Sequence, residues 1–431
     1  MRDIVAMILA GGRVFELSVL TSIRTKAAVP FGGQYRIIDF ALSSLMRSDI
    51  ERVGVLSLYR PSSLIAHLGI GEPWDMVGRG RGVKILPPYL AEGDHDPNQW
   101  YRGTADAVYK NLSYIKDHNP RDVLILSGDH IYSMDFRPFI RQHRESDADL
   151  SMVVKPLPTG FGRGRFGFAE VDENLRVRGY QEKPDQPRSN LASLTIYLFK
   201  TDVLVERLEE NRRAGSSYQL YSEVLPEMVK RDRVFAHKYY DYWNYARSID
   251  SFWQANMDLL GENPLIDLEK WGIRSRVLLY GLGDLPPTHF IEDCRCTNSL
   301  ICQGARVAGQ VDNSVIGPGV VVEAGARVTS SVLMNNVMVE AEAIVDRAVL
   351  DKQVTVGRRA RVGHGDKTPL NREMPEAFAS GISVIGKNTR IPEGVTIGRN
   401  CAVHPELKLP AWPATVLKSG ECLGRPEGST A

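Results

Sequence analysis

Hydrophobic residues follow two different patterns along the chain. Over residues 1–262, short runs rich in Val, Ile and Leu alternate with stretches of helical spacing. The runs predict strands, and the stretches between them predict helices. The predicted strands are 4–10, 53–57, 123–127, 150–155 and 193–199, and the clearest predicted helices are 105–116 and 252–260. Continuous apolar strands that alternate with helices predict a Rossmann-like α/β domain, with a mixed, mainly parallel sheet covered on both faces.

The last third of the chain repeats an aliphatic residue every six positions. The sixfold series starts again 17 residues later, twice, and continues after a gap at residues 363–384. This period matches no helix or hairpin and is typical of a hexapeptide-repeat parallel β-helix. The gap predicts a loop inserted between coils. The repeated positions are Ile316, Val322, Val328, Leu333, Val339, Val345, Leu350, Val356, Val362, Ile385, Ile391, Ile397 and Val403.

These patterns divide the chain into four parts. The α/β domain is expected over 1–262, and the β-helix over 291–419. Residues 263–290 contain several Pro and Gly residues and are expected to form a connector. Residues 420–431 are rich in Gly, Pro and Ser, which predicts a mobile tail.

Composition narrows the class of protein. The 431 residues are 43% hydrophobic and 24% charged, with a net charge of +1, which is ordinary for a globular protein. Bulk charge therefore favours neither a nucleic acid nor a membrane surface as partner. No secretory signal or membrane span is visible. The five cysteines fit no zinc-binding spacing, so we expect free thiols in a cytoplasmic chain.

Two glycine-containing turns follow predicted strands. Gly11 and Gly12 follow the first strand, and Gly128-Asp129-His130 follow the third. Both turns fall at the carboxyl edge of the sheet, where such folds bind ligands. Glycines without a Cβ atom let backbone N–H groups approach a phosphate. Asp129 is a candidate ligand for Mg²⁺, although a cap of the next turn would also explain it.

Other segments carry polar residues suited to a sugar phosphate. Glu182 can accept hydrogen bonds from sugar hydroxyls and Lys183 can pair with a phosphate, although a solvated ion pair is the alternative. Ser193, at the start of a predicted strand, can hydrogen-bond a sugar. Residues 101–106 read as a turn that caps a helix and could approach a base.

Taken together, these segments resemble the ADP-glucose pyrophosphorylase (glucose-1-phosphate adenylyltransferase) family. The resemblance covers nearly the whole chain and implies a nucleotidyltransferase domain followed by a left-handed parallel β-helix. It also implies transfer of adenylate from ATP to glucose-1-phosphate with Mg²⁺, in glycogen or starch synthesis. The segments are Leu9-Ala10-Gly11-Gly12, Phe31-Gly32-Gly33, Tyr35-Arg36-Ile37-Ile38-Asp39-Phe40, Trp100-Tyr101-Arg102-Gly103-Thr104-Ala105-Asp106-Ala107-Val108, Gly128-Asp129-His130-Ile131-Tyr132, Glu182-Lys183-Pro184 and Leu191-Ala192-Ser193.

The resemblance assigns roles by position. It implies that Asp129, Lys26 and Arg13 are catalytic, with Asp129 also the metal ligand. The implied nucleotide contacts are Gly11, Gly12, Gly103 and Thr104. The implied sugar-phosphate contacts are Tyr101, Gly167, Glu182, Lys183 and Ser193.

The chain departs from the family at the triphosphate loop and at the second metal ligand. The family continues its double glycine as Arg-Gly-Thr-Arg-Leu, whereas Val14 replaces the Gly and Glu16 replaces the second Arg here. Glu16 thus turns attraction for a polyanion into repulsion. Tyr245 stands where the family has its second metal-binding Asp, and a neutral phenol is a poor ligand for Mg²⁺. Asp241 and Asp250 are near in sequence but out of register, and replacement of the missing metal ligand by either one is the alternative.

A further departure concerns the activator segment. Ile23 and Ala27 replace the Lys and Pro of the family's Lys-Arg-Ala-Lys-Pro-Ala segment. In some members of the family, that Lys serves the activator site.

Two hypotheses follow. In the first, the chain is a subunit with weak or lost catalysis that binds glucose-1-phosphate or ADP-glucose and regulates an active paralogue. In the second, it is an active adenylyltransferase with a variant phosphate loop, which uses ATP. Both allow a small-molecule effector and a homotetramer or heterotetramer. A hexapeptide-repeat acyltransferase is disfavoured, because only His364 and His404 lie in the β-helix and His364 falls in the inserted loop.

Overall fold

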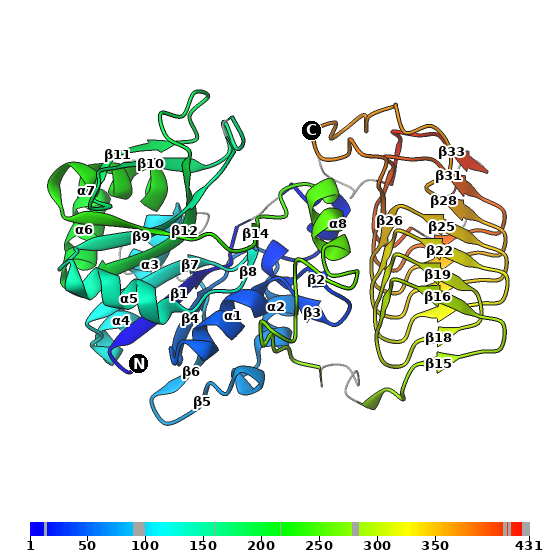
Figure 1. The fold of residues 1–431 in the computed structure, drawn as a ribbon, viewed down its shortest axis with the longest axis horizontal. Helices are drawn as coiled ribbons and strands as arrows, with labels where there is room; N and C mark the ends of the chain where they lie inside the picture. Colours follow the sequence, from blue (N-terminus) through cyan, green and yellow to red (C-terminus); the bar gives the residue numbers. More distant parts are fainter. Residues whose placement is uncertain are drawn as a thin grey trace.

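A computed structural model of the chain describes residues 1–12, 15–88, 100–158, 160–215, 217–277, 284–407, 412 and 415–424. Figure 1 shows an α/β domain beside a column of short stacked strands. Helix α8 (Ile249–Met257) lies between them.

The α/β domain is built on one large mixed sheet. Its strands are β1 (Ile4–Leu9), β4 (Arg52–Leu56), β5 (Val77–Gly78), β6 (Arg81–Leu86), β7 (Asp122–Ser127), β9 (Leu150–Pro156), β10 (Gly167–Val171), β11 (Val177–Glu182), β12 (Leu191–Lys200) and β13 (Val234–Lys238). The order is β11-β10-β12-β7-β1-β4-β6-β5, with β9 beside β12 and β13 beside β9. Strands β7, β1, β4 and β6 run parallel, whereas β12 is antiparallel to β7. The predicted mixed sheet with parallel strands is confirmed.

Two small two-stranded sheets lie beside it. They pair β2 (Pro30–Phe31) with β3 (Tyr35–Arg36), and β8 (Ile131–Tyr132) with β14 (Trp243–Asn244).

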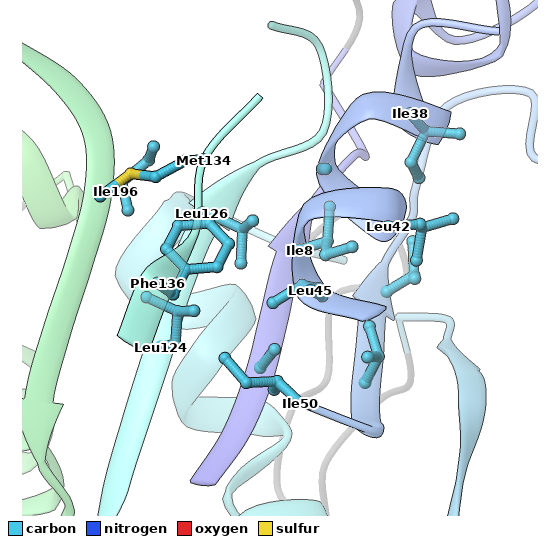
Figure 2. Close-up of a cluster of buried hydrophobic side chains, with 14 of the residues drawn as sticks. Ile8, Ile38, Leu42, Leu45, Ile50, Leu124, Leu126, Met134, Phe136 and Ile196 are labelled. Atoms are coloured by element: carbon cyan, nitrogen blue, oxygen red, sulfur yellow. The ribbon is translucent and has the colours of Figure 1, made fainter. Parts of the chain in front are cut away.

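The large sheet is buried on both faces because its central strands are mainly apolar, and β1 is apolar at every position. Ile4, Ala6 and Ile8 of β1 pack on one face, and Val5 and Met7 pack on the other. The first face carries α1 (Ile38–Arg47), α2 (Ser62–Leu68) and α5 (Phe136–Glu145). The second carries α3 (Thr104–Lys110), α4 (Leu112–His118), α6 (Thr201–Ala214) and α7 (Leu225–Arg231), with a π-helical turn at Leu220–Val224. Figure 2 shows Leu45 of α1 close to Ile8, and Phe136 of α5 beside Leu124 and Leu126, on the first face.

The single helix predicted over 105–116 is two helices. Asn111 separates α3 from α4 with a non-helical backbone (φ −104°, ψ 21°). Its side-chain amide donates to the Ala107 carbonyl at 2.8 Å and to the Tyr101 hydroxyl at 2.9 Å. Asn competes with the helix backbone for hydrogen bonds, which explains the break.

The C-terminal strands form three parallel sheets around an aliphatic core. The first is β15 (His289–Phe290), β18 (Arg306–Val307), β21 (Val321–Val322), β24 (Met338–Val339), β27 (Thr355–Val356) and β30 (Arg390–Ile391). The second is β16 (Arg295–Thr297), β19 (Gln310–Asp312), β22 (Arg327–Thr329), β25 (Ile344–Asp346), β28 (Arg361–Val362), β31 (Thr396–Ile397) and β33 (Val416–Leu417). The third is β17 (Leu300–Ile301), β20 (Val315–Ile316), β23 (Val332–Leu333), β26 (Ala348–Leu350), β29 (Ser383–Ile385), β32 (Ala402–Val403) and β34 (Cys422–Leu423).

The register of these sheets confirms the predicted hexapeptide β-helix. Ile316 pairs with Leu333, and Leu333 pairs with Leu350. Leu350 then pairs with Ile385, so the coil continues across the inserted loop at 363–384. The strands run from His289 to Leu423, slightly beyond the expected 291–419 at both ends. Residues 425–431 of the expected tail lie outside the described part of the chain.

One shared core joins the two domains. The third sheet of the β-helix turns Val315, Val332, Val349 and Val384 outward, each one position before a core residue. These valines belong to the same buried cluster as Phe252 of α8. The α8 helix and the segment before it are therefore fixed by packing from both domains.

Two further predictions can be compared with the structure. Within the described residues, no helix has the length and apolar character needed to cross a membrane. All five cysteines are free thiols, as expected.

Candidate functional site

A cavity of about 440 Å³ opens at the carboxyl ends of β1 and β7. Strands from the antiparallel part of the sheet close its other side. Every predicted site residue that the structure describes lines this cavity, with the exception of Glu16. Glu16 pairs with Lys26, which does line it. Arg13 and Val14 lie outside the described residues. The predicted residues that line the cavity are Gly11, Gly12, Lys26, Tyr101, Gly103, Thr104, Asp129, Gly167, Glu182, Lys183, Ser193 and Tyr245.

The glycines are required by close backbone contacts. A Cβ atom on Gly11 would lie 2.9 Å from the Leu58 amide nitrogen, and one on Gly103 would lie 2.2 Å from the Tyr218 carbonyl oxygen. Thr104 fixes the same segment, because its backbone N–H and its hydroxyl both contact the Gln219 side-chain oxygen at 3.3 and 3.2 Å. The predicted nucleotide side of the cavity is therefore a wall of tightly packed backbone.

On the sugar-phosphate side, a carboxylate (Glu182) and an ammonium group (Lys183) line the cavity. The Glu182 carboxylate accepts a hydrogen bond from the Tyr180 hydroxyl at 2.9 Å, and Lys183 Nζ lies 3.8 Å from it. Burial raises the pKa of Glu182, which the Tyr180 hydrogen bond and the Lys183 charge offset only in part. The Ser193 hydroxyl lies 3.0 Å from that of Tyr197. This side offers hydroxyl, carboxylate and ammonium groups to a sugar phosphate.

Close packing shapes this side as well. A Cβ atom on Gly167 would lie 1.9 Å from the Tyr180 hydroxyl oxygen. Tyr101 is fixed from outside the cavity, because its hydroxyl donates to the Leu86 carbonyl at 3.1 Å and accepts from Asn111.

On the predicted catalytic side, the charged side chains are paired with one another. Lys26 Nζ lies 3.2 Å from Asp129 Oδ2 and 3.6 Å from Glu16 Oε2. It also donates to the Tyr245 carbonyl at 2.7 Å and lies 3.7 Å from the centre of the Tyr245 ring. Arg247 Nε lies 2.9 Å from the other Glu16 oxygen. Glu16, Lys26, Asp129 and Arg247 therefore pair with one another.

These contacts set the protonation states. Burial raises the pKa of Asp129, but the Lys26 ammonium and the Ser127 hydroxyl more than offset this effect, so the pKa lies below its usual value and the carboxyl is ionised. Burial, and then Asp129 and Glu16, raise the pKa of Tyr245 well above its usual value. The phenol is neutral at neutral pH.

The histidine beside Asp129 is neutral for a similar reason. Burial lowers the pKa of His130 to about 4. Trp243 Nε1 donates to His130 Nδ1 at 3.2 Å, so the ring proton is on Nε2.

The residues present do not fit the Mg²⁺ site that the resemblance implies. Mg²⁺ requires oxygen ligands in octahedral array, usually including carboxylates. Asp129 is already paired with Lys26, and Tyr245 offers a neutral phenol in place of a second carboxylate. Within the described residues, no group of three or more His, Cys, Asp or Glu side chains is placed to hold a metal.

Neither neighbouring aspartate compensates for Tyr245. Asp250 accepts hydrogen bonds from the Ala379 amide at 2.9 Å and the Ser380 hydroxyl at 2.7 Å, both in the loop inserted into the β-helix. Asp241 contacts Lys155 through its backbone carbonyl at 2.5 Å. Neither residue is among those that line the cavity.

Some residues of the site were missed by sequence reasoning. Tyr180 lies two positions before Glu182 on one strand, so the period of two could have placed both on the same face. Arg247 is a charged residue two positions from Tyr245, but nothing in the sequence shows its contact with Glu16. Gln219 reaches Thr104 across 115 residues, and no local signal indicates this contact.

Comparisons with known proteins agree with this architecture. A model of the nucleotidyl transferase family matches residues 5–262, and a model described as GlmU-like, C-terminal hexapeptide matches residues 286–385. The glucose-1-phosphate adenylyltransferase of Thermomicrobium roseum is 42% identical over 449 residues, which covers 98% of this chain and 97% of the relative. Those of Acetivibrio thermocellus and Thermotoga maritima are 36% and 40% identical, and each covers at least 97% of this chain. The chain belongs to the glucose-1-phosphate adenylyltransferase family.

Proposed function

We propose that this chain is a subunit of a glucose-1-phosphate adenylyltransferase whose own catalysis is weak or lost. In this proposal, it binds glucose-1-phosphate or ADP-glucose and regulates an active paralogue in glycogen or starch synthesis. The observation that carries the proposal is the contact of Lys26 with Asp129 and Glu16, beside Tyr245.

The family reaction explains why this contact matters. A phosphate oxygen of glucose-1-phosphate attacks the α-phosphorus of ATP, and pyrophosphate leaves. Catalysis of such a transfer consists mainly of alignment and of neutralising charge on the phosphates. Lys26 lines the cavity, and both Lys26 and Arg247 are paired with Glu16. A triphosphate would have to displace a carboxylate to reach them.

The expected loss is large. Removing one charged contact from a phosphoryl-transfer site typically costs a few kcal/mol of transition-state stabilisation. Here a cationic side chain and a metal-binding carboxylate of the family are both replaced, at Glu16 and Tyr245. If the two effects add, the rate falls by about 10⁴-fold or more.

The opposite side of the cavity supports ligand binding. Glu182, Lys183 and Ser193 keep the residue types of the family and all line the cavity. Losses confined to the triphosphate side indicate a changed role rather than general decay.

A pyrophosphate-release assay tests the proposal. The purified chain with ATP, glucose-1-phosphate and Mg²⁺ is expected to turn over far more slowly than about 1 s⁻¹, the low end of ordinary enzyme rates. Faster turnover would contradict it and support the alternative, an active adenylyltransferase with a variant phosphate loop. That alternative is favoured by the roughly uniform 36–42% identity to relatives named as adenylyltransferases.

Calorimetry tests the binding half of the proposal separately. Glucose-1-phosphate or ADP-glucose is expected to bind, and a Lys183→Met variant is expected to bind more weakly because the phosphate loses its ammonium partner. If neither ligand binds to the unmodified chain, the sugar pocket is not functional.

The assembly is also part of the proposal. A regulatory subunit requires an active partner, so we expect a heterotetramer with a paralogue and a small-molecule effector. Co-expression with an active family member and gel filtration of the product tests this. If the chain forms only homotetramers, the regulatory role fails.

A further inference from the structure

The Lys26 ammonium is enclosed by oxygen atoms. Its side chain is 1% exposed, although it lines the cavity. Two carboxylates from separate segments and one backbone carbonyl surround Nζ, at 3.2 Å from Asp129, 3.6 Å from Glu16 and 2.7 Å from Tyr245. The Tyr245 ring covers the remaining side at 3.7 Å from its centre.

Carboxylate and carbonyl oxygens are also the ligands that hold hard divalent cations. The donor set around Lys26 is therefore one that would suit a metal, with an ammonium at its centre. Both carboxylate oxygens lie within 3.6 Å of the same nitrogen atom. They are thus close enough for side-chain rotation to bring both onto one ion.

Charge balance explains why this arrangement does not admit a divalent cation. Asp129 and Glu16 carry two negative charges, and Lys26 and Arg247 carry two positive charges. Tyr245 contributes none, because its phenol is neutral. An added divalent cation would meet the Lys26 ammonium at contact distance, which is strongly repulsive where water is excluded.

From this geometry we infer that Lys26 is a resident cation that occupies the position of a divalent metal ion, with Glu16 as the second carboxylate of the site. Glu16 then has a structural role that its replacement of an arginine alone does not reveal. The cavity binds its ligands without a divalent cation, and removing the Lys26 ammonium opens a metal site made of Asp129, Glu16 and the Tyr245 carbonyl.

The inference deepens the proposed function, but the two can fail separately. Turnover in the pyrophosphate assay would overturn the proposed function. Binding of a divalent ion at Asp129 in the unmodified chain would overturn this inference, whatever the turnover.

Titration with Mn²⁺ alone, followed by electron paramagnetic resonance, provides the test, because Mn²⁺ favours carboxylate and carbonyl oxygens. Mn²⁺ binding is assigned to this site only if the Glu16→Gln and Asp129→Asn substitutions abolish it. The unmodified chain is expected to show no such binding. Lys26→Met is expected to bind one equivalent of Mn²⁺, at least about tenfold more tightly than any binding by the unmodified chain, because it removes the ammonium between two half-buried carboxylates and leaves Asp129 without its cation, although Glu16 keeps Arg247. A Lys26→Met chain that gains no Mn²⁺ would overturn the inference.

Lys110→Met is the matched control. Lys110 is equally buried, and its Nζ lies 3.7 Å from Asp106 and donates to the Trp100 carbonyl at 2.8 Å. Arg102 also pairs with Asp106, at 3.3 Å. Asp106 keeps the Arg102 cation when the Lys110 ammonium is removed, so this variant is expected to gain no Mn²⁺ site. Equal gain in both variants would mean that any buried lysine gives the result, and would overturn the inference.

Thermal unfolding keeps the inference testable if Lys26→Met fails to fold without metal. Ligands that bind only the native state raise the unfolding temperature. Mn²⁺ is expected to leave the unfolding temperature of the unmodified chain unchanged. It is expected to restore folding of Lys26→Met. The opposite result is that Mn²⁺ raises the unfolding temperature of the unmodified chain but not that of Glu16→Gln. That result would show that a metal already competes with Lys26, contrary to the inference.

Discussion

The Arg24 guanidinium and the Asp351 carboxylate form a buried two-point ion pair that joins the α/β domain to the β-helix. The two hydrogen bonds measure 2.9 and 2.8 Å, and the side chains are 4% and 0% exposed. A charge pair removed from water at a domain boundary fixes the relative position of the two parts, because neither charge can lose its partner cheaply.

Arg24→Met is therefore expected to destabilise the protein by about 3–5 kcal/mol, since it leaves the buried Asp351 carboxylate without its guanidinium partner. Denaturant unfolding measures the loss. The double variant Arg24→Met/Asp351→Leu is expected to recover much of it. Arg358→Met is the control: this pair with Glu342 is more than half exposed, and its loss is expected to cost less than about 1 kcal/mol. Equal effects of Arg24→Met and Arg358→Met would contradict the role of burial.

Gly103→Ala is expected to disrupt the nucleotide side of the cavity. The backbone at Gly103 is extended, so the problem is space rather than torsion. The new Cβ atom would lie 2.2 and 2.6 Å from the carbonyl oxygens of Tyr218 and Ser217, and the backbone must move. We expect a loss of roughly 1–3 kcal/mol in stability, measured by denaturant unfolding. Unchanged stability would show that the wall can relax.

His130 is expected to make stability depend on pH between about 4 and 6.5. Its pKa is near 4 in the native protein and near 6.5 when unfolded, so the unfolded chain binds the extra proton in this window. The contribution is complete above 6.5 and is lost as pH falls toward 4, at up to about 1.4 kcal/mol per pH unit.

Unfolding of the unmodified chain and of His130→Asn at several pH values measures this contribution. The variant is expected to show a shallower slope between pH 4 and 6.5. Parallel curves would mean that the imidazole is charged in the native protein, contrary to the acceptor role of Nδ1 toward Trp243.

Restoring the family residues is expected to raise activity. Glu16→Arg with Val14→Gly and Tyr245→Asp returns the cation and the second carboxylate, and we expect pyrophosphate release to increase by about 10²-fold or more. The same triple variant with Asp129→Asn serves as the control and is expected to lose the gain. If the triple variant is no faster than the unmodified chain, another defect limits the reaction.

Much of the fold could be predicted because its signals are periodic. The spacing of Ile316, Leu333 and Leu350 gave the stacking register of the β-helix, since one aliphatic residue in each short strand must face the core. The break at Asn111 could not be predicted, because its side chain competes with the helix through a partner outside it, the Tyr101 hydroxyl.

The sequence predicted which residues form the candidate site, but it did not predict their contacts with one another. The sequence named Lys26, Asp129, Glu16 and Tyr245, and showed that two of them depart from the family. It left Asp250 as a substitute ligand. The structure places that carboxylate against the inserted loop instead, and only packing between α8 and the β-helix decides this.

The sequence by itself determined the two domains, the family and the positions at which this chain differs from it, because strand alternation, sixfold spacing and motif identity are local properties. Only the tertiary structure decided what those differences do. It places Lys26 Nζ 3.2 Å from Asp129 and 3.6 Å from Glu16, and it places Arg247 2.9 Å from the other Glu16 oxygen, although these residues come from separate segments. The buried Lys26 ammonium needs anionic partners, so the Glu16 that looks like a defect in the sequence is one of the carboxylates that balance its charge.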